Sequence, residues 1–220
     1  MGKSLPLSAA PPRPRRSQAE RRAESERSLL ESAAVLMSEQ GYGATTLEQI
    51  GQRAGYSRGL VSQKFGSKEG LVAALVEVLH RDFALATFES PDQHQTGRAA
   101  VLSIVDYYMA HMTDDLVPVR AYFVLMSESI GVIPEIRSTF VEANRRFQAH
   151  LRQKTLDGQL DGSISADIDA GKLAVALMSL VTGHTLIWLV DPEIADPEQA
   201  KQNILAATER LLGEAGARGL

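Results

Sequence analysis

Apolar residues recur every three or four positions along most of this 220-residue sequence, and the long segments after the fourth expected helix keep this spacing instead of a strand pattern. This spacing predicts amphipathic α-helices, because half-buried strands would show alternation instead. Glycines, prolines and N-capping residues divide the pattern into nine expected helices. Their approximate ranges are residues 17–41, 46–54, 58–65, 67–79 and beyond, 97–112, 118–131, 134–158, 170–190 and 196–213. The sequence therefore predicts an all-α fold.

Two short helices separated by a glycine turn follow the first long one. Either Thr45 or Thr46 can cap the first of them, with Glu or Gln three residues on completing a capping box. Gly55 ends this helix, and Ser57 caps a second one that Gly66 breaks. The residues expected to hold the two helices together are Ile50, Ala54, Tyr56, Val61 and Phe65. This arrangement predicts a helix-turn-helix, whose second helix can enter the major groove of DNA.

The order and spacing of residues through this turn are similar to those of the N-terminal DNA-binding domain of TetR/AcrR-type regulators. The similarity covers roughly residues 26–75. It is carried by Gly41, Tyr42, Thr45, Thr46, Ile50, Ala54, Gly55, Ser57, Gly59, Phe65, Ser67, Lys68, Glu69 and Leu71. The resemblance implies a three-helix DNA-binding domain followed by a helical domain that binds an effector and dimerises. We therefore divide the chain into an arm (1–17), a helix-turn-helix domain (18–66) and an effector-binding and dimerisation domain (67–220).

The second short helix carries the expected DNA contacts. Arg58 is the main candidate for reading a base, because its guanidinium fork matches guanine O6 and N7, and Gln63 suits adenine N6 and N7. Lys64, Lys68 and Thr46 are expected to bind phosphate. The complete set of expected DNA-binding residues is Thr46, Ser57, Arg58, Gly59, Leu60, Ser62, Gln63, Lys64 and Lys68.

Three positions depart from the family's usual pattern. The family usually has alanine where this chain has Gly51, tyrosine where it has Ser62, and often histidine where it has Lys64. Ser62 can still donate to a phosphate, with a shorter reach, and Lys64 adds a full positive charge. These departures leave an alternative open, namely an all-helical module that binds a small molecule or a protein and has weak or vestigial DNA binding.

Charge is distributed unevenly along the chain. Residues 1–70 carry 11 Lys and Arg against 7 Asp and Glu, whereas the remaining residues carry 12 against 20. A basic front on an acidic body is expected when only the front meets a polyanion. Residues 1–17 are rich in Pro and Ser and contain three arginines, so they cannot build a core. They are either a basic arm lying along a DNA groove or a tail without contacts.

Two apolar segments near the C-terminus are candidates for a subunit interface. Residues 170–190 are apolar on nearly every side, and a helix of that kind in a soluble protein must be covered all round. A last helix follows, begun by Asp196 and Pro197. The pair can form a four-helix bundle with its copy, or it can be internal core, and the resemblance favours a homodimer through these two helices. The apolar run is interrupted by polar residues and no secretory signal precedes it, so we expect a cytoplasmic protein without membrane contact.

The sequence shows no enzyme constellation. It has no cysteine, no Gly-rich phosphate loop and no paired metal-ligand spacing, so we expect no catalysis, cofactor or metal. Large or polar-tipped residues among apolar ones are candidates for an effector cavity, and Glu128 among them suits a cationic ligand. The candidates are Tyr107, Tyr108, His111, Tyr122, Met126, Glu128, Phe147, His184 and Trp188. The predicted function is a ligand-responsive regulator, with repression as its expected output, that binds a palindromic operator as a dimer; the operator and effector are not identified.

Overall fold

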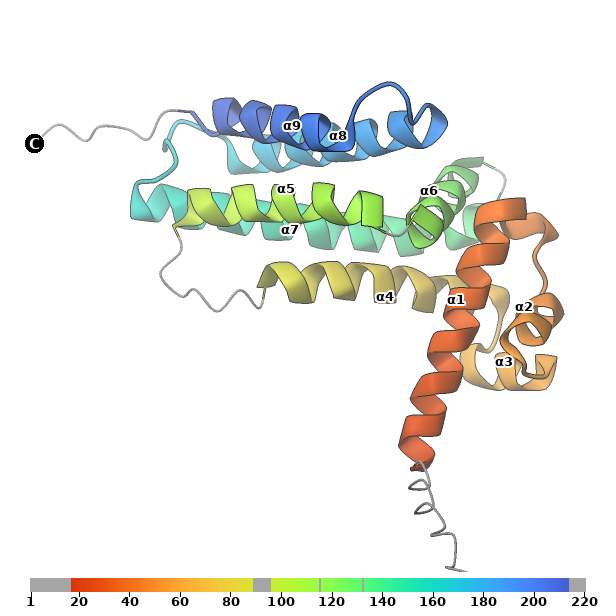
Figure 1. The fold of residues 1–220 in the computed structure, drawn as a ribbon. Helices are drawn as coiled ribbons and strands as arrows, with labels where there is room; N and C mark the ends of the chain where they lie inside the picture. The colour runs from red at the N-terminus through yellow and green to blue at the C-terminus, as the bar shows by residue number, and fades with distance from the viewer. Residues whose placement is uncertain (1–16, 89–95, 115, 132, 214–220) are drawn as a thin grey trace, which may run out of the picture.

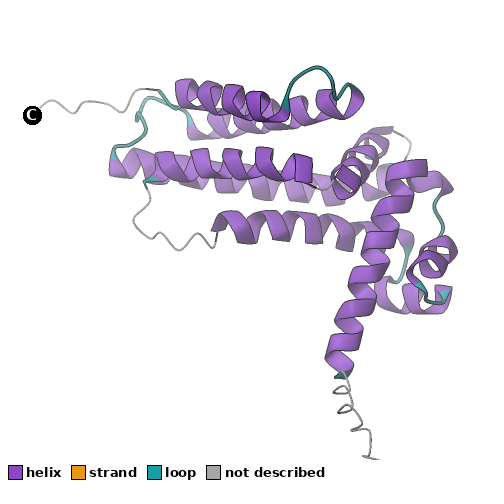
Figure 2. Ribbon diagram, viewed as in Figure 1, coloured by secondary structure: helices purple, strands orange, loops and turns teal. Residues whose placement is uncertain are grey.

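A computed structural model describes residues 17–88, 96–114, 116–131 and 133–213, without the side chains of residues 80–88 and 112–114. Within these ranges the chain forms nine α-helices, one 3-10 turn and no strand (Figure 2). The helices are α1 (Gln18–Ala44), α2 (Leu47–Ala54), α3 (Arg58–Phe65), α4 (Lys68–Phe88), α5 (Gly97–Asp114), α6 (Leu116–Gly131), α7 (Arg137–Asp161), α8 (Ala170–Val190) and α9 (Pro197–Leu211), with η1 at Pro134–Ile136. The predicted all-α fold of nine helices is confirmed. Residues 1–16 of the predicted arm lie outside the described ranges.

The helices are arranged as a stack with a smaller unit at one end. In Figure 1, α4, α5, α7, α8 and α9 run roughly side by side, and α1 crosses the end of this stack. Helix α5 packs on α7 and α9, α7 packs on α8, and α6 lies along α1. Helices α2 and α3 sit on the outer side of α1, away from the stack (Figure 1). We call α1–α3 with the start of α4 the head, and the remaining helices the body.

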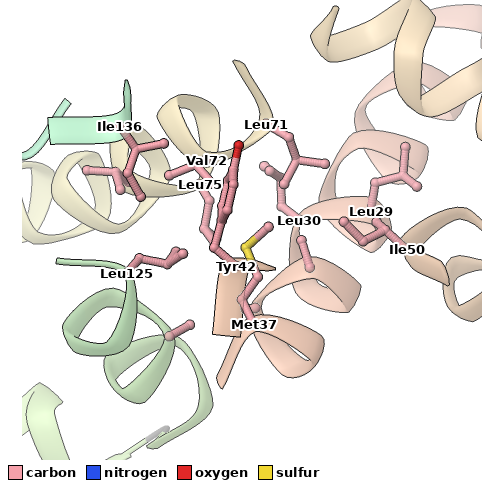
Figure 3. Close-up of a cluster of buried hydrophobic side chains, with 14 of the residues drawn as sticks. Leu29, Leu30, Met37, Tyr42, Ile50, Leu71, Val72, Leu75, Leu125 and Ile136 are labelled. Atoms are coloured by element: carbon pink, nitrogen blue, oxygen red, sulfur yellow. The ribbon is translucent and has the colours of Figure 1, made fainter. Parts of the chain in front are cut away.

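The largest apolar core lies where the head meets the body. Leu29 and Met37 of α1, Leu71 of α4 and Leu125 of α6 are all fully buried in one cluster. Figure 3 shows the Tyr42 ring in the middle of these side chains. Burying a Leu or Met side chain contributes about 1.5–3 kcal/mol, so this shared cluster is a principal source of stability for both parts. The domain boundary between residues 66 and 67 stays a prediction.

Local capping explains where most helices begin. The hydroxyl of Ser17 accepts a hydrogen bond from the Glu20 amide at 3.1 Å, while the Glu20 carboxylate accepts one from the Ser17 amide at 2.6 Å. Asp196 caps α9 by accepting from the Gln199 amide at 3.0 Å, with Pro197 as the first helical residue. Both starts confirm what the sequence predicts, since these residue types satisfy the free N–H groups of a first turn.

One predicted helix end was wrong. Helix α7 continues past Gly158 to Asp161 and ends at Gly162, whose φ is 79°. Gly158 instead lies at the crossing of α5 and α7, where a side chain on Gly97 would overlap the Gly158 backbone. Glycine here serves close helix packing and does not stop the helix.

Helix α8 is not covered on every side within one chain. Five of its apolar residues are buried, namely Ala170, Leu173, Ala174, Leu177 and Val181. Four others are well exposed, namely Val175 (50%), Leu186 (42%), Ile187 (53%) and Val190 (80%). Among the described residues α8 alone is, as a single helix, long and apolar enough to cross a membrane. Its exposed apolar face is large enough to need an explanation.

Candidate nucleic-acid interface

The turn between α2 and α3 has the geometry of a helix-turn-helix. The Thr46 hydroxyl accepts from the Gln49 amide at 3.2 Å, and the Gln49 side chain accepts from the Thr46 amide at 2.8 Å, which completes a capping box. Gly55 ends α2 with a φ of 78°, a left-handed conformation that glycine adopts without strain. Ser57 then caps α3 by accepting from the Leu60 amide at 3.3 Å. The predicted caps and turn are confirmed.

Gly51 has a packing role in this turn. The amide of Tyr56 donates to the Gly51 carbonyl at 2.7 Å. A Cβ on Gly51 would lie 2.9 Å from the Tyr56 carbonyl oxygen and 3.1 Å from the Ser57 carbonyl carbon. The missing side chain therefore lets the turn fold closely onto α2, which gives this departure from the family pattern a structural reason.

Apolar side chains fix α3 from behind. Ile50 of α2 and Val61 of α3 are both completely buried. Ala54, Tyr56 and Phe65 are partly buried and pack against the same cluster. All five side chains named from the sequence contribute to this packing, as predicted. Helix α3 is thereby held with one face toward the protein and the opposite face in solvent.

The solvent face of α3 presents the expected base-reading residues. Arg58, Gly59 and Gln63 are exposed, as is the capping residue Ser57, and Ser62 is half-buried. Leu60 is half-buried and faces α1. The exposed guanidinium fork at the start of α3 and the exposed amide further along it can each form bidentate hydrogen bonds with base edges. Contact of these residues with DNA stays a prediction.

Lys64 is turned toward α1. Its side chain is 15% exposed, and its Nζ donates to the Arg22 carbonyl oxygen at 2.9 Å. The Glu26 carboxylate lies 3.7 Å from the same nitrogen. The ammonium thus links the end of α3 to the first turns of α1. Phosphate binding by Lys64 stays a prediction, and it requires the ammonium to leave or share these contacts.

Lys68 is held within the head. Its Nζ donates to the carbonyl oxygens of Tyr42 and Thr45, each at 2.8 Å, and lies 3.9 Å from the centre of the Tyr42 ring. Burial lowers the pKa of Lys68, while the carboxylates of Glu69 and Glu128 raise it. The ammonium group thus has two hydrogen-bond acceptors and a cation–π contact, which together stabilise its charged form within the head. Lys68 therefore has a structural role here, and its phosphate contact stays a prediction.

Sequence reasoning missed the basic residues of α1 beside the recognition helix. A groove of about 360 Å³ runs between the two helices and is lined by Gln18, Arg21, Arg22, Ser25, Leu60 and Lys64. Arg21 and Arg22 are exposed. The sequence indicated only a solvated surface at these positions, because their proximity to α3 depends on how α1 packs. These side chains can bind a phosphate that flanks bases read by α3.

The predicted effector residues do not form one group. The rings of Tyr108 and Phe147 stack at 5.9 Å, and the Tyr122 hydroxyl donates to Asn144 at 3.4 Å. Burial raises the pKa of Tyr108 to about 12, against hydrogen bonds with threonines of α8 that lower it, and burial also raises the pKa of Tyr122. His184 is half-buried, and burial lowers its pKa. These residues are all partly buried in the body.

Four further candidates have different immediate surroundings. Tyr107 stacks on exposed His111 with ring centroids 3.6 Å apart. Met126 packs against the core shared by head and body. Trp188 is half-buried, and its Nε1 is buried without a hydrogen-bond partner among the described residues.

Glu128 lies where α6 meets the segment after α1, and its role as a ligand for a cation stays a prediction. Its carboxylate accepts a hydrogen bond from the Tyr42 amide at 2.9 Å. The described residues contain no group of three His, Asp or Glu placed to hold a metal ion.

The arrangement of α1–α3 defines a helix-turn-helix DNA-binding protein with a separate helical body. Residues 29–75 match the family described as bacterial regulatory proteins, tetR family, and residues 97–213 match the BetI-type transcriptional repressor C-terminal family. The chain belongs to the TetR family of regulators. It is a ligand-responsive, DNA-binding transcriptional regulator, as the sequence predicts.

Individual relatives are distant but cover most of the chain. The regulator TtgR of Pseudomonas putida is 24% identical over 188 residues, covering 76% of this chain and 81% of its own. The regulator BetI of Paraburkholderia xenovorans is 27% identical over 189 residues, covering 82% of this chain and 88% of its own.

Solved structures show the same fold. A TetR-family regulator from Rhodococcus sp. superimposes with a TM-score of 0.75 at 18% identity, over 87% of this chain and 100% of its own. The regulator FadR from Bacillus subtilis, solved in complex with stearoyl-CoA, gives a TM-score of 0.75 at 16% identity, over 85% of this chain and 97% of its own.

Proposed function

We propose that this chain is a homodimeric repressor that binds a palindromic operator through α3 and releases it when a small molecule enters the body. The observation that carries the proposal is the two-sided burial of α3. Val61 is completely buried, whereas Gln63 on the opposite side of the helix and Arg58 in its first turn are exposed. One such helix reads few base pairs, so two heads about one turn of B-DNA apart (~34 Å) are needed for useful specificity.

Different residues have different roles in this proposal. Arg58 and Gln63 read bases, and Ser62, Thr46, Arg21 and Arg22 bind phosphates. Ser57 and Gly59 let the start of α3 approach the duplex closely. Acting on DNA places the protein in the cytoplasm, and we assign it no catalytic activity. The proposal is favoured over vestigial DNA binding because Gly51, one motive for that alternative, has a packing role instead.

A gel-shift titration on the DNA upstream of the gene tests the base-reading role. Arg58→Ala should lower the affinity by about 1–3 kcal/mol and relax the preference at one base position. Arg152→Ala is the matched control, because it removes an exposed arginine from α7 in the body. Equal affinity of the wild type for that fragment and for unrelated DNA would refute a specific operator.

The exposed apolar face of α8 supports the homodimer. One side of α8 exposes four apolar side chains, those of Val175, Leu186, Ile187 and Val190. Leu211 of the neighbouring helix α9 is 43% exposed. A hollow of about 560 Å³ between the two helices is lined by Ala176, Ser179, Leu180, Ala207, Arg210 and Leu211. A second copy of the pair would bury this face in a four-helix bundle about a two-fold axis.

We propose that the effector site lies at the partly buried aromatic residues of the body. Tyr108, Tyr122 and Phe147 supply apolar surface, and His184 and Trp188 supply polar groups. A buried indole N–H costs about 1–3 kcal/mol when it has no acceptor, as is the case for Trp188 among the described residues, so an acceptor on the effector would stabilise the complex. Trp188 is the only tryptophan of the chain, so its fluorescence reports on this site directly. A compound that lowers operator affinity without changing that emission would place the effector site elsewhere.

A further inference from the structure

The last turn of α1 is broken at Gly41. Its φ of 75° and ψ of 178° lie outside the helical region, and Tyr42 follows with its amide directed away from α1. That amide donates to Oε2 of Glu128, on α6 of the body, at 2.9 Å. A carboxylate that accepts from a backbone amide forms a charge-assisted bond, stronger than a bond between neutral groups. A residue of the body thus holds the amide at the exit of the first head helix.

Gly41 makes room for this carboxylate. A Cβ at position 41 would lie 2.6 Å from Oε1 of Glu128, closer than real side chains approach. The positive φ at the same residue also favours glycine. The carboxylate of Glu128 therefore occupies the space that a side chain on residue 41 would need.

Tyr42 joins this contact to the rest of the head. Its hydroxyl donates to the Glu69 carboxylate of α4 at 2.7 Å, and its ring and carbonyl hold Lys68. Hydrogen bonds from Ser67 and Tyr42 lower the pKa of Glu69 to about 2, so it stays ionised at neutral pH. The segment of residues 41–46 is thereby fixed to α6 on one side and to α4 on the other.

The same segment leads directly into the helix-turn-helix. The Thr45 hydroxyl donates to the Gly41 carbonyl at 2.7 Å. The carbonyl oxygen of Thr45 accepts a hydrogen bond from Lys68 Nζ at 2.8 Å. Thr46 is the next residue and caps α2. A displacement of Glu128 is therefore transmitted to α2, and from there to α3, through the short hydrogen-bonded segment of residues 41–46.

Helix α6 also carries an aromatic residue of the proposed effector site. Tyr122 lies six residues before Glu128 on this helix, about 9 Å along the axis. Tyr122 is one of the side chains that we assign to the effector site. A shift of α6 caused by an effector would therefore carry the Glu128 carboxylate with it, because a helix moves as a rigid element.

We propose that Glu128 is a positioning residue that couples the body to the head through the Tyr42 amide. Through this bond, the binding of DNA by the head depends on the position of α6, and the position of α6 depends on whether DNA is bound. The coupling rests on the proposed function, since it presupposes that the head binds DNA. Thermodynamic linkage requires this coupling to be reciprocal, so DNA binding alone must alter hydrogen exchange in α6. The coupling can therefore be tested without an effector.

Hydrogen exchange with and without DNA from upstream of the gene tests the coupling. In the wild type, DNA should slow exchange at residues 58–65 and also at residues 116–131, by about fivefold or more for a typical coupling. Glu128→Ala should keep the slowing at residues 58–65 and lose it at residues 116–131. Glu128→Gln should restore it, because the amide oxygen can still accept from Tyr42. Ser127→Ala, an exposed neighbour on α6, is the control and should behave as the wild type.

The outcomes separate the coupling from DNA binding itself. Equal slowing of α6 exchange in the wild type and Glu128→Ala would overturn the coupling while leaving DNA binding intact. No slowing at residues 58–65 in the wild type would refute the proposed function and the coupling with it. If Glu128→Ala fails to fold, the wild type still decides, because the exchange rate of the Tyr42 amide must change on adding DNA. An unchanged rate would overturn the proposal.

Discussion

His150 gives the body a stability that depends on pH. The residue is 8% exposed, on the face of α7 that packs into the body. Burial, with a smaller effect of Lys154, lowers its pKa from 6.5 to about 4, against an opposing effect of Asp157. The native state therefore resists protonation, whereas the unfolded chain takes up a proton near the ordinary pKa of histidine, about 6.5.

The direction and size of the effect follow from linkage. Above pH 6.5 both states hold a neutral ring, so the stability from this residue is fully present. As the pH falls from 6.5 toward 4, only the unfolded state gains the proton, and the free energy of unfolding falls. A shift from 6.5 to about 4 corresponds to a loss of at most about 3 kcal/mol, at 1.36 kcal/mol for each pKa unit.

Urea unfolding of the wild type and His150→Gln at pH values between 7 and 4 measures this loss. Glutamine does not titrate, so the wild type should lose up to about 3 kcal/mol more than the variant over this range. Loss of the packing of the imidazole ring lowers the free energy of unfolding of the variant by the same amount at every pH. It therefore does not affect the comparison of the two pH dependences. Ala149→Gln places the same side chain on an exposed position of α7 and should keep the wild-type pH dependence. Parallel stability curves for the wild type and His150→Gln would refute the reasoning.

Three further predictions concern the helix crossing, the subunit face and the groove beside α3. Gly97→Ala should lower the free energy of unfolding by about 1–3 kcal/mol, because the added methyl group overlaps the Gly158 backbone, and a thermal melt that matches the wild type would contradict this. Leu186→Arg should convert the proposed dimer to monomers in sedimentation velocity, whereas Ile130→Arg, at an exposed apolar position on α6, should leave it intact. Replacing Arg21 and Arg22 by Gln should reduce the slope of log K against log salt by about two, because about 0.9 counterion is released for each phosphate contact, and an unchanged slope would exclude them from the interface.

The head could be predicted well because its signals are local. Capping residues, Gly55 and the spacing of Ile50 and Val61 all act within a few residues, and each of them was confirmed. The bounds of α8 could also be predicted, because its residues are apolar over nearly the whole length of the helix. The end of α7 was missed because Gly158 is explained by a neighbouring helix, not by its own sequence context.

Side-chain partners far apart in sequence could not be predicted. Lys64 and Lys68 bond to carbonyls 42 and 26 residues away, and Glu128 to an amide 86 residues away. Residue type suggested a phosphate ligand for each lysine and a cation ligand for the glutamate. Which way a long flexible side chain turns depends on the surfaces that packing brings near it, and no local pattern records that.

The shared core between α1, α4, α6 and α7 restricts how such a regulator can be rebuilt. Grafting residues 17–66 onto the body of another regulator would separate Leu29 and Met37 from Leu125 and Phe140, which pack together in one cluster. A chimera cut at that point would expose apolar surface on both halves and lose cooperativity of unfolding. Exchange of DNA specificity should therefore succeed by replacing only the outward side chains of α3, with the seam between the two parts kept native.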